Sequence, residues 1–199
     1  MALKIQYNKT FSQQLKKQLV IRERALPTLK SKETALRIEV KKAAERVEKI
    51  QRDLLIEVDE LKKAGILLRE FPDILRIDQY KIGIRNVAGV KVPYLEELGF
   101  RIETINFFNN SAWLLMGIES LKKIVQRKVE FSLAKKQFEI LNYSRKKTTQ
   151  KVNLYEKVQI PEFRESILKI KRYLEDEENL LKAAQKIVKE RHLASETEP

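Results

Sequence analysis

The first third of the chain repeats apolar residues with a period that only a long helix can use. Alternating steps of four and three residues from Leu15 to Leu68 visit sixteen positions, and thirteen of them are apolar. These seam positions are Leu15, Leu19, Arg22, Leu26, Leu29, Glu33, Leu36, Val40, Ala43, Val47, Ile50, Leu54, Glu57, Leu61, Ala64 and Leu68. A 3.5-residue repeat of this length is typical of a left-handed coiled coil. We expect a helix on the order of 80 Å long, too long for the core of a compact domain.

Glycine divides the 199-residue chain into three parts, because all five glycines lie between Gly65 and Gly117. The flanks without glycine favour long helices. One such helix cannot bury its own apolar stripe, so the second flank is expected to fold back antiparallel on the first. The predicted fold is therefore mainly α: a long antiparallel two-helix left-handed coiled coil with a short β-hairpin-containing insert between the helices. The predicted parts are a first helix at 1–68, an insert at 69–112, a second helix at 113–192 and a frayed tail at 193–199.

The insert and the helix starts carry local signals of their own. Period-two alternation predicts short hairpin strands at Tyr80–Arg85 and Val90–Val92, joined by a turn that contains glycine. Strands this short are expected to lean on the helices and to leave one face for a partner. Ser12 or Thr10 is expected to cap the first helix, and Asn110 or Ser111 the second, where Trp113 is expected to pack under the insert.

Several kinds of chemistry are not encoded in this sequence. It has no cysteine and a single histidine, so neither a thiolate zinc site nor a histidine-based triad can be built. No phosphate-binding loop occurs, and no run of about 18 apolar residues predicts a membrane span. We therefore expect a cytoplasmic, non-catalytic chain without cofactor or metal and without direct insertion into a membrane.

The net charge of +13 is concentrated in two stretches, with 14 basic and 5 acidic residues at 1–52 and 11 and 4 at 118–160. Heptad geometry places four basic residues outside the seam: Lys41, Lys42, Lys49 and Arg52. They are candidates for contact with acidic protein surfaces, although a merely solvated face is an open alternative. A basic coiled coil could also bind nucleic acid, but no nucleic-acid-binding motif and no interleaved aromatic platform is apparent.

Three stretches resemble the D subunit of the V-type and A-type rotary ATPases, in the right order and across nearly the whole chain. They are "NKTFSQQLKKQL", "RNVAGVKVP", and "KVNLYEKVQIP" followed by "RESILKIKRYLEDEE". Lys9 stands where the family commonly has proline. The family-like positions are Asn86, Gly89, Val90, Val92, Pro93, Val152, Asn153, Ile160 and Pro161. The candidate partner-binding residues in these motifs are Arg85, Asn86, Gly89, Val90, Lys91, Val92, Pro93, Asn153 and Pro161.

The resemblance implies a central axle that transmits torque and holds no nucleotide itself. Its implied partners are the A and B subunits of the catalytic hexamer, the small F subunit and a funnel-shaped subunit on the membrane rotor ring; nucleic acid is not among them. Two rival stalks fit less well. The γ subunit of F-type enzymes has a large central α/β domain, and an export-apparatus stalk usually lacks an insert.

Proline inside the second long helix needs a physical reason. If the helices pair antiparallel, Pro161 lies at the level of about residue 25 and thus near Pro27, and the two prolines would bend the pair together. The alternative is that Pro161 simply begins a second helix at its first position.

Overall fold

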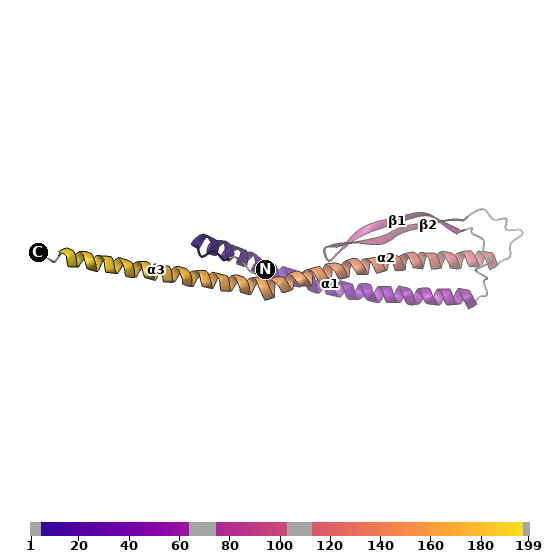
Figure 1. The fold of residues 1–199 in the computed structure, drawn as a ribbon. Coiled ribbons are helices and arrows are strands. Elements are labelled where there is room, and N and C mark those ends of the chain that lie inside the picture. Colours follow the sequence, from indigo (N-terminus) through magenta and orange to yellow (C-terminus); the bar gives the residue numbers. More distant parts are fainter. Residues whose placement is uncertain (1–4, 64–74, 103–112, 197–199) are drawn as a thin grey trace. The chain divides into compact units, whose positions relative to one another are not determined.

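The computed structural model describes residues 5–63, 75–102 and 113–196 and divides the chain into two compact units. Residues 1–31 and 149–199 form the terminal unit, and residues 32–148 form the hairpin unit. The element order is α1 (Lys9–Lys63), β1 (Leu75–Val87), β2 (Val90–Ile102), α2 (Trp113–Asn153), η2 (Leu154–Gln159) and α3 (Ile160–Glu196), as drawn in Figure 1. The predicted fold class, two long helical segments packed together with an antiparallel hairpin between them, is confirmed.

The start of α1 differs from the prediction in its cap. The Asn8 side chain accepts a hydrogen bond at 2.6 Å from the backbone N–H of Phe11, so Asn8 is the N-cap rather than Thr10 or Ser12. Lys9 is then the first helical residue, a position whose N–H has no intrahelical acceptor in any case. Proline is favoured there for the same reason, so lysine and proline can both occupy this position.

The predicted seam of α1 is confirmed along the described length of the helix. Every seam position from Leu15 to Leu61 is buried or partly buried, including Arg22, Glu33 and Glu57. Leu36 is fully buried, while Leu55 and Ile56, which lie off the seam, are more than half exposed. Ala64 and Leu68, where the first helix was expected to end, lie outside the described residues, as do the caps expected at Asn110 and Ser111 and the side chain of Trp113.

The hairpin is much longer than the sequence pattern predicted. β1 and β2 contain 13 residues each and pair antiparallel from Leu75 opposite Ile102 to Val87 opposite Val90. The register shifts between Ile77 and Gln79 and again between Lys81 and Ile82. Such bulges break strict alternation along a strand, which is why the pattern revealed only the end next to the turn.

The second helical segment is continuous in its helical backbone but changes its type. Between α2 and α3 the six residues of η2 form a π-helix, and both flanking residues, Asn153 and Ile160, keep right-handed helical dihedrals. Pro161 is the second residue of α3. The alternative in which Pro161 begins a second helix at its first position is therefore wrong, because α3 begins at Ile160 and no break precedes it. The helix extends to Glu196, beyond the predicted end at 192.

Each unit pairs its helical segments antiparallel around an apolar cluster of its own. In the terminal unit Leu15, Phe163 and Ile170 are buried, with Leu19, Ile167 and Leu174 packed around them. In the hairpin unit the buried cluster joins three elements, with Leu36 from α1, Val92 from β2 and Leu141 from α2. Burying large aliphatic side chains in this way contributes about 1.5–3 kcal/mol for each one.

Candidate partner-binding surfaces

The hairpin turn is built for its tight geometry and anchored by one residue. Ala88 and Gly89 have positive φ values of 50° and 77°, as the two central residues of a type I′ hairpin turn require. Val92, three residues beyond, is 1% exposed and packs in the cluster with Leu36 and Leu141. Val92 was expected on the partner surface, but its side chain lies in the core. The expectation that the insert leans on the helices is thereby confirmed.

A buried amide, which sequence reasoning missed, holds the strand after the turn. Gln137 of α2 is 6% exposed, and its Nε2 donates to the carbonyl oxygen of Pro93 at 2.5 Å. Its Oε1 accepts a longer hydrogen bond from Nη2 of Arg85 at 3.4 Å. Because an unpaired buried amide is costly, these contacts fix the position of the hairpin on α2. The only available signal was an amide at a helical position between apolar neighbours.

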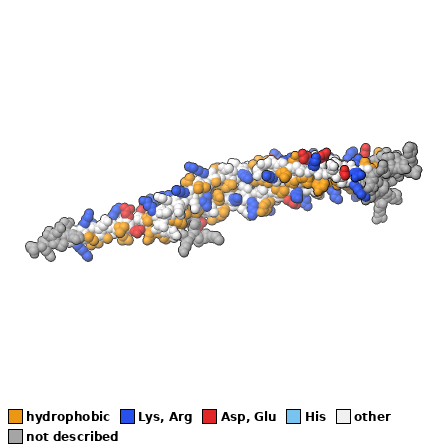
Figure 2. Space-filling view, turned by 90° about the horizontal axis from the view of Figure 1, so that it is seen from above, with side chains coloured by type: hydrophobic (Ala, Val, Ile, Leu, Met, Phe, Trp, Pro, Cys, Tyr) orange, Lys and Arg blue, Asp and Glu red, His pale blue; other side chains and the backbone are white. Residues whose placement is uncertain are grey.

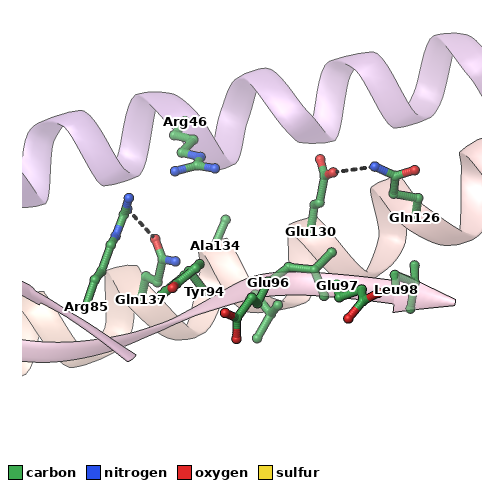
Figure 3. A pocket seen from close by; sticks show the side chains of 12 residues that line it. Arg46, Arg85, Tyr94, Glu96, Glu97, Leu98, Gln126, Glu130, Ala134 and Gln137 are labelled. Atoms are coloured by element: carbon green, nitrogen blue, oxygen red, sulfur yellow. Dashed lines mark hydrogen bonds between the residues drawn. The ribbon is translucent and has the colours of Figure 1, made fainter. Parts of the chain in front are cut away.

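An open polar cavity of about 330 Å³ lies between α1, β2 and α2 of the hairpin unit. Figure 3 shows the side chains of Arg46 and Arg85 at one end of it and those of Glu96 and Glu97 along β2. Glu130 lies at the other end, where its carboxylate accepts a hydrogen bond at 3.1 Å from Gln126. Charged groups of both signs suit contact with complementary charges of a partner.

Next to this cavity Arg127 links the two helices of the hairpin unit. Its Nε lies 3.3 Å from Oε1 of Glu57, and its Nη1 lies 3.4 Å from Oε2 of Glu130. The hydrogen bond to Glu57 is the main cause that raises the pKa of Arg127 above its ordinary value. Within the described part of the chain, the buried Oε2 of Glu57 has no hydrogen-bond partner. The acidic interruption of the apolar seam is thus compensated by one arginine across the helix pair.

The four basic residues that heptad geometry placed outside the seam are all exposed. Lys42 lies 2.9 Å from Glu39, and Lys41 lies 4.0 Å from Glu45, both within one helix. Exposed pairs of this kind contribute little to stability, so the ammonium groups are available to other acidic groups at small cost. Lys49 and Arg52 are exposed on the same helix. Their role toward a partner stays a prediction.

The motif "KVNLYEKVQIP" coincides with the π-helix. The backbone N–H of Ile160 donates to the carbonyl oxygen of Tyr155, five residues earlier instead of four. Pro161 has no N–H and, in a regular α-helix, its ring would press against the carbonyl four residues earlier. The wider π turn relieves that contact, and π turns are frequent at functional sites. Asn153 and Pro161 are both exposed.

Arg22 of α1 clamps the π-helix from the facing helix. Its Nε donates to Oε1 of Gln159 at 2.6 Å, and its guanidinium lies 4.6 Å from the ring centroid of Phe163 and 5.8 Å from that of Tyr155. Arg22 was the first polar exception in the predicted apolar seam. Its burial is compensated by one hydrogen bond and two aromatic faces.

Ion pairs on both sides of this clamp fix the register of the terminal unit. Lys30 lies 2.6 Å from Glu156, and Arg164 lies 2.6 Å from Glu23. Together with the Arg22–Gln159 contact, they place residues 159–164 at the level of residues 22–23, close to the predicted level of residue 25. Pro27 is four residues beyond Glu23 inside α1, so the two prolines lie within about two turns of each other. The shared bend itself stays a prediction.

The remaining candidate residues surround the hairpin turn. Arg85, Asn86 and Lys91 are exposed, and Val90 and Pro93 are partly buried. Gly89 lies beside Lys32 of α1, whose Nζ would be 3.4 Å from an added Cβ. The structure thus brings together Arg85–Pro93 at one end of the hairpin, and Asn153 with Pro161 around the π-helix. It places Lys41, Lys42, Lys49 and Arg52 along one helix.

These features define a class: antiparallel helical coiled-coil proteins with a hairpin braced against the helix pair. Residues 12–190 match the family of the ATP synthase D subunit, and the chain belongs to that family. It is 32% identical over 194 residues to the V-type ATP synthase D subunit of Borreliella burgdorferi, with 94% of each chain covered. It is 27% identical over 184 residues to the protein of that name from Chlamydia felis, with 87% of this chain and 88% of the relative covered.

Proposed function

We propose that this chain is a non-catalytic central-stalk subunit that transmits torque in a rotary ATPase. It would couple the hexamer of A and B subunits, which hydrolyses or makes ATP, to the membrane rotor that moves protons or sodium ions. The observation that carries the proposal is the match to the D-subunit family over residues 12–190. The relatives that are named as D subunits of V-type ATP synthases align over most of their own length, so the likeness is not confined to a shared coiled coil.

An exposed apolar stretch of α3 supports a location inside a larger assembly. Beyond Leu174 every described side chain up to Arg191 is exposed, although the heptad pattern continues. Leu180, Leu181, Ile187 and Val188 are between 51% and 72% exposed. Apolar side chains in such a row are typical of a helix covered by a partner. In the proposed function that partner is the inner surface of the hexamer.

The proposed location is cytoplasmic and peripheral to the membrane. Among the described residues no helix is long and apolar enough to cross a bilayer. In the proposed function, contact with the membrane rotor goes through the funnel-shaped subunit, with the small F subunit as a further neighbour on the stalk.

Co-purification tests the proposal directly. Tagged full-length chain, expressed with the other subunits of the complex, should retain A, B and F subunits through gel filtration. Retention of nucleic acid without these subunits would overturn the proposal and favour the basic nucleic-acid-binding alternative.

The exposed basic residues give the sharper test. Charge reversal at Lys41, Lys42 and Lys49 should weaken assembly with A and B subunits, and more so at low ionic strength, because screening is weaker there. The matched control reverses Lys16 and Lys17, which are also exposed on α1. Equal assembly of both variants at every salt concentration would exclude a contact role for the three lysines.

A further inference from the structure

An apolar groove runs between β1 and α2 of the hairpin unit, on the opposite edge of the hairpin from the polar cavity. It encloses about 240 Å³ and is lined by Ile77, Tyr80, Ile82, Leu98, Val129, Ser132 and Leu133. Leu133 is 9% exposed and forms part of the floor, whereas Tyr80 is 66% exposed and forms a wall. The groove has room for more than one large apolar side chain.

The apolar surface continues past the groove along β1. Ile82 and Ile84 are 48% and 70% exposed at alternate positions of the strand. Figure 2 views the molecule from above, and exposed hydrophobic side chains lie among charged ones of both signs over the part of the molecule that carries the hairpin. Contiguous exposed apolar area next to a groove is a mark of a protein–protein contact.

Two basic residues flank the α2 side of the groove. Lys128 and Lys136 are exposed on α2, four residues before and four residues after Ser132, so they lie on the same helix face as the groove. No described residue forms an ion pair with either lysine. An occupant of this groove therefore gains from acidic residues along its flank.

The backbone of β1 distinguishes between two kinds of occupant. Addition of a partner strand requires a regular edge, and β1 carries an extra residue, Asp78, at the register shift between Ile77 and Gln79, directly beside the groove. A helix needs no ladder of backbone hydrogen bonds, only a channel for its apolar row. We propose that this groove binds an amphipathic α-helix of another protein, with an apolar row facing Ile77, Tyr80 and Ile82 and acidic residues facing Lys128 and Lys136.

Photo-crosslinking tests this inference independently of the rotary function. Tyr80 is replaced by a photoreactive benzoylphenylalanine in the full-length chain, expressed in the cells that normally make it, and the crosslinked segment is sequenced by mass spectrometry. The expected segment has apolar residues every three to four positions and glutamate or aspartate between them. The same photoreactive residue at Ile56, which is 57% exposed on α1 and does not line the groove, should not capture that segment.

Charge reversal supplies the second measurement. Lys128→Glu with Lys136→Glu should lower the yield of that crosslink by about threefold or more, whereas Lys16→Glu with Lys17→Glu should leave it unchanged. A captured segment with strand-like alternation, one with basic flanks, no crosslink to another protein, or a yield indifferent to Lys128 and Lys136 would overturn the inference. Because the readout is the captured sequence, failure here leaves the co-purification with A and B subunits untouched.

Discussion

The two units of this chain pair antiparallel helices by different means. In the hairpin unit the seam is covered by a third element, because Val92 of β2 packs onto Leu36 and Leu141. In the terminal unit helix faces helix directly, and around the π-helix its apolar cluster is supplemented by polar contacts: Arg22 with Gln159, Lys30 with Glu156 and Arg164 with Glu23. The same heptad pattern therefore supports an apolar three-element core in one region and, in the other, a two-helix apolar cluster with polar contacts beside it.

Because of this difference, we expect the two regions to respond differently to ionic strength and to mechanical force. Apolar burial is not weakened by charge screening, whereas exposed ion pairs weaken as ionic strength rises. A π turn also bonds each N–H to a carbonyl five residues back instead of four, so its hydrogen bonds can be exchanged locally with those of an α-helix. We expect the hairpin unit to be the stiffer region and the π-helix to be the place where the helix pair yields first.

Truncation of Leu36 should produce the largest effect. Leu36 is 0% exposed, and Leu36→Ala should lower the free energy of unfolding of the hairpin unit by about 2–5 kcal/mol through lost burial and a cavity. Since Leu36 contacts the hairpin cluster, amide hydrogen exchange should also rise around Val92. Leu55→Ala is the matched control at 61% exposure on the same helix and should be nearly neutral. Equal losses for the two variants would contradict a core centred on Leu36.

Removal of the Arg22 clamp should have a smaller effect, confined to the terminal unit. Arg22→Ala loses the hydrogen bond to Gln159 and the contacts with two rings, so we expect a loss of about 1–2 kcal/mol. Hydrogen exchange should rise across residues 154–163 and stay unchanged at the hairpin. Arg24→Ala removes an exposed arginine two residues away and serves as the control. Faster exchange at the hairpin in Arg22→Ala would mean that the two regions are not independent.

The hairpin turn offers a pair of substitutions with opposite signs. The Cβ of Ala88 is sterically strained at a φ of +50°. Ala88→Gly removes this strain and should stabilise the hairpin by about 0.5 kcal/mol. Gly89→Ala should destabilise it by about 1 kcal/mol because φ is +77° there, whereas the new Cβ would lie at an ordinary contact distance of 3.4 Å from Nζ of Lys32. Denaturant unfolding of both variants measures the two shifts. Shifts of the same sign would exclude the backbone conformation as their cause.

The sequence predicts features that depend on a pattern of nearby residues, but not contacts between residues far apart in the chain. The seam of α1 was predictable because one periodic pattern defines one buried face, and that face is buried from Leu15 to Leu61. The length of the hairpin was not, because its bulges interrupt the alternation. Nor was the π-helix, since residues such as Leu154 and Lys157 suit an α-helix equally well. Gln137 gains its meaning only from the carbonyl of Pro93, which is 44 residues away.

The exposed end of α3 should show the smallest effect. Neither the core of the hairpin unit nor the polar contacts around the π-helix stabilise this end. There the contacts are within one helix, and Nζ of Lys182 lies 2.9 Å from Oε1 of Glu178. This hydrogen bond is the main cause that lowers the pKa of Glu178 below 4.5. A lowered pKa in the folded state means that the pair stabilises the helix above the unfolded pKa and that the gain is lost as the pH falls through the folded value.

Hydrogen exchange of residues 175–188, corrected for its intrinsic pH dependence, should therefore show a small loss of protection as the pH falls below about 4.5. Glu178→Gln should abolish that loss, because glutamine does not titrate. Glu190→Gln is the comparison, since Glu190 lies 3.8 Å from Lys186, too far for a hydrogen bond, and this substitution should change the pH profile less. A pH profile unaltered by Glu178→Gln would place the loss in another group. It would also show that the stability of this end of α3 depends on more than ion pairs within the helix.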